Sequence, residues 1–290
     1  QNLEEVIVSS VRAKENLPIA FNNISKDELS KRNLGQDIPI LLNFLPNVVT
    51  TSDAGAGIGY TGIRIRGINS QSTNVTINGI PYNDAESLGT FWVDLPDFSS
   101  SVENLQVQRG IGTSVNGSSA FGASINILTD KIAEKSFFES SNTVGSFNTI
   151  KNNFKFSTGL LNNAFEFSGR LSKIDSDGYI DRASSNLKSY FLQFSYKKNK
   201  TLLKFLNFGG PEITYQAWNG IDLLTLENNR TYNPSGLYFD LDGNEKFHEN
   251  EVDNYKQDHF QFHWTQSISN NLTSSLGLNL TNGRGFYEQY

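Results

Sequence analysis

A glycine pattern in the first third of the chain has the spacing of a phosphate-binding loop. Gly57-x-Gly59-x-x-Gly62 matches the dinucleotide fingerprint, in which glycines let the backbone approach a pyrophosphate. That chemistry needs a helix directly after the glycines, because the free amides at the helix N-terminus hold the pyrophosphate. The next residues, Ile63 to Arg66, alternate apolar and charged and so predict a strand. The pattern therefore does not predict a nucleotide site.

Two histidines have the spacing of metal ligands on a helix. His259 and His263 are four residues apart, but the segment around them alternates polar and aromatic residues and predicts a strand. Side chains four residues apart on a strand stand about 13 Å apart, whereas zinc holds each ligand nitrogen at about 2 Å. One ion cannot bridge them. We expect the histidines on a polar face of the strand and Phe260, Phe262 and Trp264 on its apolar face.

An acidic segment nearly matches a calcium-binding loop. Asp240, Asp242, Asn244 and Glu251 could supply oxygen ligands, but Glu245 occupies the sixth position, which requires glycine. A calcium site is therefore the less favoured interpretation. The chain has no cysteine, and no serine lies in a nucleophile elbow with identifiable partners, so we expect neither an enzyme nor a bound metal or cofactor.

The segment from Tyr82 to Trp92 has the composition of a small-molecule site. It combines aromatic rings with two carboxylates and several hydrogen-bonding groups, which suits a pocket with apolar walls and a few polar anchors. The segment Asp53 to Tyr60 has weaker support. The alternative is a solvent loop whose aromatic side chains dock on neighbouring structure. The candidate ligand-binding residues are Tyr60, Tyr82, Asn83, Asp84, Glu86, Phe91 and Trp92.

Bulk composition excludes two classes of protein. The 24 basic and 30 acidic residues give a net charge of −6, so there is no basic excess for nucleic acid and we expect no such partner. Hydrophobic residues make up 37% of the 290 residues, which is enough for a real core. The most hydrophobic helical candidate, Ile38 to Leu45, is too short to span a bilayer, so a helical membrane protein is excluded.

The first 130 residues mix helix and strand patterns. Ser25 and Glu28 have capping-box spacing, which predicts a helix over Lys26–Arg32. A second helix over Gln36–Phe44 should stop before Pro46, because proline disfavours helical geometry in the residue before it. Short strands separated by glycine and asparagine turns follow, so this part is predicted to be an α+β domain.

After about Glu134 the sequence predicts strands and turns. In the segment 150–158, isoleucine and phenylalanine share one face and lysine, asparagine and serine share the other. The polar face is too polar for a core. We count about seven strands, joined by turns that alternate between short and long, as in outer-membrane barrels. Short turns are expected at 160–163, 198–200 and 269–271, and long ones at 175–186 and about 216–256.

Four glycine-punctuated pieces resemble the plug domain of TonB-dependent outer-membrane receptors. They are Arg64–Gly67, Asn74–Tyr82, Val107–Gly110 and Phe121–Thr129. In this family a small globular domain closes the lumen of a large β-barrel. The resemblance implies transport through a barrel of roughly 22 strands, a size for which a plugged lumen is expected.

The fold class implied is an α+β plug domain followed by antiparallel transmembrane β-barrel strands, about seven of an expected 22 or so. We expect a TonB box and linker at 1–12, the plug at 13–133 and the N-terminal part of the barrel at 134–290. Seven strands cannot close this barrel, so we interpret the chain as a fragment. It should not insert stably in a bilayer alone, because an open sheet edge leaves backbone amides unpaired in lipid.

The segment just before the plug resembles the TonB box of the family. Glu5-Val6-Ile7-Val8-Ser9-Ser10 has the order acidic, three aliphatic, two small polar. By resemblance it binds the periplasmic domain of TonB by adding a strand to a sheet edge, so backbone hydrogen bonds provide a handle for pulling. The alternative is an ordinary first strand of the domain.

Charged residues on the predicted plug strands are candidates for a latch. By resemblance, Arg64, Arg66, Glu103 and Arg109 pair with barrel-wall carboxylates and hold the plug, and breaking that latch is part of transport. The alternative is that these residues are ordinary charged side chains of strands that point into solvent. The resemblance also implies that the loop after Pro81 lies at the plug apex, facing outside, where it contributes to the ligand site.

Two further pieces, Thr214–Gly220 and Gly285–Tyr290, resemble versions of the family from Bacteroidetes-type bacteria, where iron-chelate receptors are frequent. We therefore expect energy-coupled uptake of a scarce ligand, with an iron chelate (siderophore) favoured. A glycan or cobalamin importer of the same family is the first alternative, and a surface β-rich adhesin is an alternative of another class. The expected partners are TonB, outer-membrane lipid and a small-molecule metal chelate, in a Gram-negative outer membrane.

Overall fold

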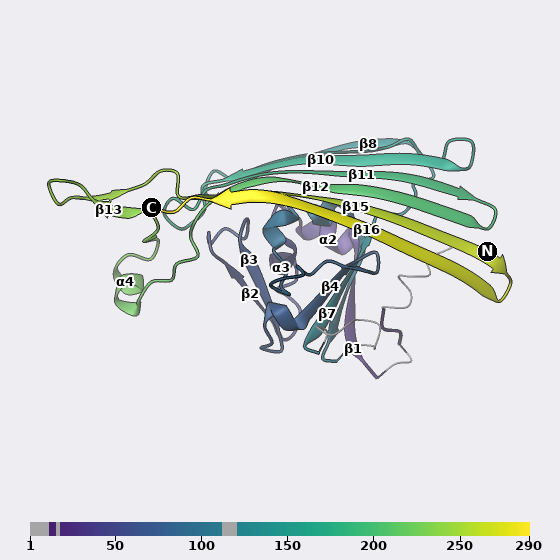
Figure 1. Ribbon diagram of the computed structural model, residues 1–290, viewed down its shortest axis with the longest axis horizontal. Coiled ribbons are helices and arrows are strands. Elements are labelled where there is room, and N and C mark those ends of the chain that lie inside the picture. The colour runs from purple at the N-terminus through teal and green to yellow at the C-terminus, as the bar shows by residue number, and fades with distance from the viewer. Residues whose placement is uncertain (1–11, 16–17, 112–120) are drawn as a thin grey trace.

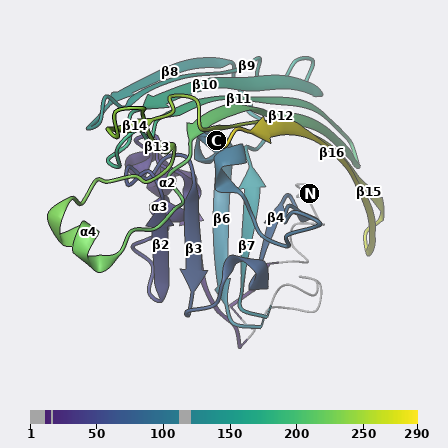
Figure 2. The same cartoon turned by 60° about the vertical axis from the view of Figure 1, so that its left-hand side comes forward.

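The structure is a computed structural model and describes residues 12–15, 18–111 and 121–290. A small α+β domain lies against the concave side of a long, curved antiparallel sheet (Figure 1). The turned view shows the same arrangement, with the small domain beneath the curve of the sheet (Figure 2). We call the small domain the plug and the curved sheet the wall.

The wall is an antiparallel meander of seven strands, the number expected from the sequence. Its edges are β8 and β16, so the described sheet is an open arc and not a closed barrel. In spatial order the strands are β8 (Phe137–Val144), β9 (Ile150–Ser157), β10 (Phe165–Ser176), β11 (Ser185–Lys198), β12 (Thr201–Tyr215), β15 (Val252–Ser269) and β16 (Leu272–Tyr287).

Side chains along the wall alternate between burial against the plug and exposure on the outer face. On β9, Lys151 and Asn153 are buried, whereas Ile150 and Phe154 are exposed. A sheet with one face in water shows the reverse, with its apolar face buried. Apolar residues outside and polar residues inside are the pattern of a barrel with lipid around it and a polar lumen. The alternation predicted for this strand is confirmed.

The strand β15 shows the same two faces. His259 and His263 are buried toward the plug, whereas Phe260 is exposed and Phe262 and Trp264 are partly exposed on the outer face. The predicted strand, and the predicted division of its polar and aromatic residues, are confirmed.

The plug is built on a five-stranded mixed sheet and a separate hairpin. In the sheet β4 and β7 pair in parallel, and the other neighbours pair antiparallel. The hairpin is β2 (Val48–Ser52) and β3 (Thr61–Ile65), so a strand stands where a dinucleotide fingerprint needs a helix. The sheet order is β1 (Ala20–Ser25), β6 (Val102–Arg109), β7 (Ala123–Thr129), β4 (Thr73–Ile77) and β5 (Ile80–Pro81).

Short helices cover the plug, beginning with α2 (Lys26–Arg32), whose predicted bounds are confirmed. The Ser25 hydroxyl accepts from the Glu28 amide at 3.3 Å, and the Glu28 carboxylate accepts from the Ser25 amide at 2.9 Å. The capping box therefore satisfies two amides that the first helical turn leaves free. Three short 3₁₀ turns follow along the chain: η1 (Ser70–Ser72), η2 (Trp92–Asp94) and η3 (Phe98–Ser101).

The second predicted helix, Gln36–Phe44, is wrong in length, because α3 spans only Ile38–Leu41. After it the chain tightens into turns, with hydrogen bonds from the Asn43 amide to the Ile40 carbonyl at 3.2 Å and from the Leu45 amide to the Leu42 carbonyl at 3.0 Å. Pro46 excludes helical geometry at the residue before it, so the segment closes with tight three-residue turns instead of a further α-helical turn.

The apolar core of the plug continues into the wall. Ile65, Ile77 and Leu105 are buried within the plug, and the same cluster includes Phe208 of β12. The Phe98 ring of η3 lies 5.2 Å from the Phe208 ring, between centroids. The plug is therefore seated on the wall partly by the hydrophobic effect.

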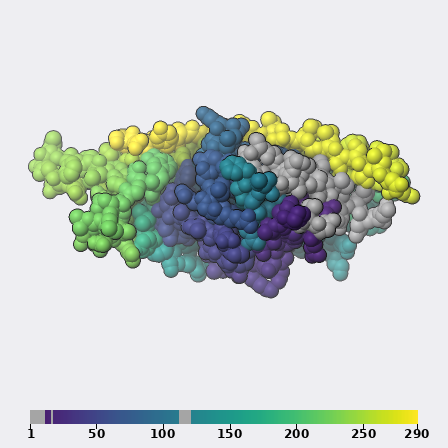
Figure 3. Space-filling view, turned by 90° about the horizontal axis from the view of Figure 1, so that it is seen from below, coloured from purple at the N-terminus to yellow at the C-terminus, as the bar shows by residue number. Residues whose placement is uncertain are grey.

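The two ends of the wall differ. Turns of two residues, 199–200 and 270–271, join strands at one end, whereas 177–184 and 216–251 connect them at the other. The longest connection carries α4 (Leu223–Asn228), β13 (Leu237–Phe239) and β14 (Glu245–Phe247) and projects beyond the wall (Figures 1 and 3). It ends before Val252, not near Lys256 as expected, because Val252 already pairs with Tyr215 in the wall ladder. No helix among the described residues is long and apolar enough to cross a bilayer.

A charged side chain introduced on the outer face of the wall should lower the stability of the protein in a bilayer. Phe205 on β12 is 44% exposed on that face. We expect Phe205→Lys in the full-length natural protein to lower the free energy of unfolding by about 2–4 kcal/mol, because a lysine near the bilayer midplane must leave water. Urea unfolding in liposomes measures this. Phe205→Leu is the control and should cost much less, and equal stability of both variants would contradict lipid contact at this face.

Candidate ligand site and plug–wall contacts

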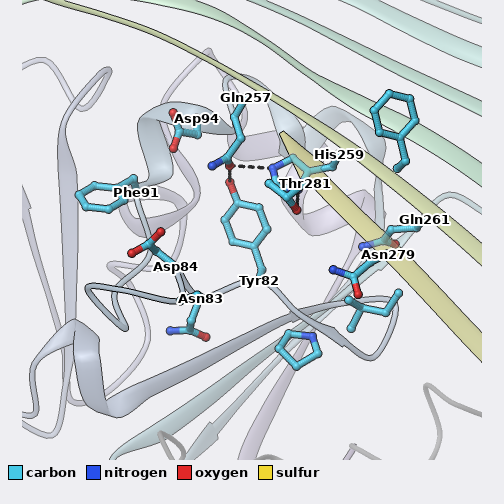
Figure 4. A pocket seen from close by; sticks show the side chains of 14 residues that line it. Tyr82, Asn83, Asp84, Phe91, Asp94, Gln257, His259, Gln261, Asn279 and Thr281 are labelled. Carbon is cyan, nitrogen blue, oxygen red and sulfur yellow. Dashed lines mark hydrogen bonds between the residues drawn. The ribbon is translucent and has the colours of Figure 1, made fainter. Parts of the chain in front are cut away.

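A cavity of about 300 Å³ lies between the plug and the wall beside β15 and β16 (Figure 4). The plug contributes the segment that follows β5, and the wall contributes inward-facing residues of two neighbouring strands. The side chains labelled in Figure 4 are Tyr82, Asn83, Asp84, Phe91 and Asp94 of the plug and Gln257, His259, Gln261, Asn279 and Thr281 of the wall.

A chain of hydrogen bonds runs through this cavity from the plug to β16 (Figure 4). The Tyr82 hydroxyl donates to Gln257 Oε1 at 3.4 Å, and His259 Nε2 lies 2.7 Å from the same oxygen. An amide oxygen accepts but does not donate, so Nε2 carries the proton. Nδ1 then accepts from the Thr281 hydroxyl at 3.0 Å. One network therefore joins the plug loop to two wall strands.

Two polar side chains fix the shape of the loop after β5. Asn83 Oδ1 accepts from the Val75 amide at 2.7 Å, and the Asn83 amide group donates to two backbone carbonyls. Asp84 Oδ1 accepts from the Ser87 amide at 2.7 Å in an Asx turn, and this bonding lowers the pKa of the Asp84 carboxyl. These side chains hold the loop in place, so they position the aromatic residues at its ends.

A second cavity, of about 450 Å³, lies next to the first and shares part of its lining. Tyr60, directly before β3 of the plug hairpin, donates a hydrogen bond to Asp253 of β15. The Tyr60 ring also meets Trp218 of the long connection edge-on, with 5.4 Å between centroids. Five carboxylates line this cavity: Asp84, Glu86 and Asp94 of the plug and Glu212 and Asp253 of the wall.

Burial and crowding of carboxylates shift the titration of plug groups at this site. Burial raises the pKa of Asp94 to about 7, and the negative charges of Asp253 and Asp84 add to the rise. Burial also raises the pKa values of the Tyr60 and Tyr82 hydroxyls. Asp94 therefore exchanges a proton near neutral pH, while both tyrosines remain neutral hydrogen-bond donors.

The structure brings six of the seven sequence-predicted ligand residues to the two cavities, and their role in binding stays a prediction. Trp92 is the exception, because it is 2% exposed and packs in the plug core. The η2 turn directs this large ring inward, where burial of its apolar surface is more favourable than contact with an open cavity. The six at the cavities are Tyr60, Tyr82, Asn83, Asp84, Glu86 and Phe91.

Sequence reasoning missed the wall side of the site and Asp94. Asp253, Tyr255 and Gln257 have the same parity as His259 on β15, so the alternation that placed His259 inward could have identified them. Asp94 lies in a 3₁₀ turn and belongs to no periodic pattern.

A buried ionic cluster centred on Asp97 joins the plug to the wall. Asp97 has a left-handed φ of 50°, which aspartate tolerates better than most residues. Its carboxylate lies 2.8 Å from Lys151 Nζ and 3.5 Å from the Arg170 guanidinium. It also accepts from Asn153 at 2.5 Å and from Ser172 at 2.7 Å. Burial opposes ionisation, but Arg170 and Lys151 outweigh it and lower the pKa of Asp97.

A second cluster surrounds Asp130, just after β7. Its carboxylate lies 2.6 Å from Lys155 Nζ of β9 and 2.8 Å from Lys26 Nζ of the plug. Lys204 of β12 donates to the Asp130 carbonyl at 3.0 Å. Burial would raise the pKa of Asp130, but the two lysines at its carboxylate outweigh burial and lower it. Plug carboxylates and wall cations therefore make the ionic contacts at both clusters.

Of the four charges predicted as a latch, two make contacts within the plug and two are exposed. Glu103 pairs with Lys131 at 3.1 Å, and Arg109 donates to the Pro46 carbonyl at 3.4 Å within the plug. Arg64 and Arg66 are exposed. The ion pairs that cross from plug to wall have the opposite polarity to the expected one, since across this interface the plug supplies the acids and the wall the bases. Pairing of the three arginines with wall carboxylates stays a prediction.

The remaining sequence-derived sites lie elsewhere. The TonB-box residues Glu5 to Ser10 lie outside the described residues. Asp240 accepts from the amides of Asp242 at 3.0 Å and Asn244 at 2.8 Å, so its carboxylate shapes the tight turn of the β13–β14 hairpin. In the part of the chain that the structure describes, no group of three or more histidine, cysteine, aspartate or glutamate side chains is arranged to hold a metal ion.

Comparison with known proteins identifies the class. Residues 13–124 match the family model of the TonB-dependent receptor plug domain. The wall and plug together superpose on the ferric-catecholate import receptor Fiu of Escherichia coli K12, with a TM-score of 0.70, 14% identity and coverage of 93% of this chain and 39% of Fiu. Residues 13–124 thus belong to the plug-domain family of TonB-dependent receptors, and the described wall and plug together share the fold of such an outer-membrane receptor.

Two relatives with similar sequences are a transporter and a receptor by name. The chain is 29% identical over 178 residues to the vitamin B12 transporter BtuB of Vibrio vulnificus, covering 61% of this chain and 27% of BtuB. It is 24% identical over 194 residues to the ferrienterobactin receptor of Escherichia coli K12, covering 61% and 26%. The chain thus spans about a quarter of the length of each. Both relatives are proteobacterial, so they do not support the expected Bacteroidetes-type assignment.

The Asp97 cluster predicts a large effect from one atom exchange. We expect Asp97→Asn in the full-length natural protein to destabilise the seated plug by about 3–5 kcal/mol, because Lys151 and Arg170 would remain buried without their counter-charge. Hydrogen exchange of plug amides in detergent micelles measures this.

Matched variants give that test its controls. Asp242→Asn, at the exposed tip of the β13–β14 hairpin, should change stability by less than about 0.5 kcal/mol. A similar small effect for Asp97→Asn would show that the cluster does not hold the plug. If Arg66→Ala and Arg109→Ala leave plug retention and uptake unchanged, the arginine latch predicted from the sequence fails.

Asp94 predicts a pH dependence of stability. Its pKa is raised, so its contribution to the free energy of unfolding is present at acidic pH and is lost as the pH rises from the ordinary value of 3.8 through about 7. Asp84, Asp253, Glu212 and Tyr60 face it, so its negative charge is unfavourable. Asp94→Asn should flatten the stability profile in this interval, measured by urea unfolding. Profiles of equal slope for Asp94→Asn and the wild type would refute the assignment.

Proposed function

We propose that these residues serve energy-coupled uptake of a scarce ligand across the outer membrane, and that the ligand is an iron chelate. One observation carries the proposal: the plug loop 82–91 and inward residues of β12, β15 and β16 together line two adjoining cavities. Such a junction combines aromatic walls with a few polar anchors, as small-molecule sites do. The relative named as a ferrienterobactin receptor supports iron as the cargo.

We propose the division of the chain into a TonB box and linker at 1–12, a plug at 13–133 and wall strands at 134–290. The match of the plug model to residues 13–124 and the start of the first wall strand at Phe137 support it. TonB is the partner that this division implies, through the segment Glu5 to Ser10. Strand addition of that segment would let a pulling force act on the plug through backbone hydrogen bonds.

The contacts between plug and wall suggest how binding and movement are coupled. A ligand that enters the first cavity displaces or tightens the Tyr82–Gln257–His259 network, which shifts the loop relative to β15. The Asp97 and Asp130 clusters resist that shift, because separating a buried ion pair exposes uncompensated charge. Pulling at the N-terminus supplies the free energy that separates them.

Cobalamin is the second candidate cargo, because the relative from Vibrio vulnificus is named as a vitamin B12 transporter. A glycan importer remains the other alternative of this class. A surface adhesin would also present strands and aromatic loops, but it leaves unexplained a plug seated on the polar face of the wall by two ionic clusters.

Growth of a strain lacking the gene, on defined iron sources with cobalamin and glycans alongside, tests the cargo. We expect an iron chelate as sole iron source to require the receptor and TonB. Val8→Pro should abolish uptake but leave binding intact, because proline cannot donate the backbone hydrogen bond that strand addition needs. Val8→Ala is the matched control and should retain uptake. If the receptor is needed for growth only when cobalamin or a glycan is the limiting nutrient, that compound replaces iron as the proposed cargo.

A further inference from the structure

The second cavity contains a buried carboxylate that the protein itself does not satisfy. Glu212, near the end of β12, is 2% exposed and lines the cavity, yet its Oε2 has no hydrogen-bond partner among the described residues. A buried carboxylate oxygen without a partner costs free energy, because it has lost its water and gained nothing in exchange. The site therefore has an unmet demand for a hydrogen-bond donor or a positive charge.

The rest of the lining strengthens that demand. Five carboxylates line the cavity, and the described lining includes no lysine or arginine. The nearest basic side chain along β15, Lys256, has the opposite parity and pairs with Asp258 at 3.0 Å on the outer face. Mutual repulsion contributes to the raised pKa of Asp94 beside Asp253 and Asp84. A cation bound in this cavity would both reduce the repulsion between the carboxylates and provide a partner for Glu212.

The shape and walls of the cavity favour an organic cation over a bare metal ion. No three of the described acidic or histidine side chains converge closely enough to coordinate one ion. Tyr60, Phe91 and Tyr255 supply aromatic surface beside the carboxylates. Aromatic faces and dispersed carboxylates are the surroundings that ammonium and guanidinium groups favour.

We infer that this acidic cavity receives a positively charged amine or guanidine group of the imported ligand. The inference rests on the proposed function, and it narrows the ligand class to chelates or other solutes that carry a basic group. Glu212 and Asp253 pair with the cation, and the aromatic side chains enclose its carbon chain. A strongly anionic chelate is correspondingly disfavoured.

Binding of a simple polyamine to the full-length natural protein in detergent micelles tests the cavity directly. The probe is spermidine, and the matched probe is its fully N-acetylated, neutral derivative, with calorimetry at fixed ionic strength as the readout. We expect binding of spermidine and at least about tenfold weaker binding of the acetylated form. No binding of spermidine, or equal binding of the two, overturns the inference.

Variants locate the binding. Glu212→Gln should weaken spermidine binding about tenfold, because it removes the acidic group that pairs with the cation without changing the shape of the side chain. Asp253→Asn should weaken binding similarly. Asp258→Asn, on the same strand but with its side chain on the outer face, is the control and should bind as the wild type does. Unchanged binding in Glu212→Gln overturns the assignment.

Failure of this inference and failure of the proposed function look different. Spermidine binding that depends on Glu212, without any iron-chelate uptake, supports the cavity and removes iron as the cargo. TonB-dependent uptake of a tris-catecholate iron chelate, a trianion, that is unaffected by Glu212→Gln leaves the proposed function standing and overturns the cationic site.

Discussion

The buried carboxylate of Asp97 is the central ionic contact between the plug and the wall, because it pairs with two wall cations. Asp97 would be unfavourable where it lies, in a left-handed turn out of contact with water, without Lys151 and Arg170 of the wall. The reverse also holds, since both cations are buried and rely on the same carboxylate. This mutual dependence fixes one orientation of plug against wall, and with it the approach of the loop after β5 to β15. The two cavities between plug and wall therefore depend on this ionic contact as well as on strand geometry.

The wall can supply buried cations because its polarity is inverted. A sheet that faces lipid on one side places its apolar residues outward, so its inward face is free to carry charge. The plug provides the carboxylates of Asp97 and Asp130, and its apolar residues also reach the wall, where Phe98 meets Phe208 and Val93 clusters with Ile174 and Leu187. Polar complementarity therefore shares this interface with apolar packing. Such polar contacts can be exchanged for water during movement, whereas a continuous apolar seam would resist separation.

Local patterns in the sequence predicted local structure well. The capping box at Ser25 defined α2, and strict alternation identified wall strands such as β9 and both faces of β15, because these signals depend on near neighbours. Tertiary contacts escaped prediction. The inward orientation of Trp92 follows from the packing of the core around it. The ion pair of Asp97 with Lys151 depends on a wall strand that is distant in the sequence. The pKa of Asp94 is raised only because folding buries this side chain near other carboxylates.

The alternation on β15 has a consequence for how such a protein diversifies. Odd-numbered residues from Asp253 to Gln261 line the cavities between the wall and the plug, while even-numbered residues such as Phe262 lie on the outer face. Inward-facing and outward-facing residues therefore alternate along one strand, and a point substitution changes one face without changing the other. If the cavities bind the proposed cargo, substitutions at the inward positions could change its selection without changing the apolar outer face.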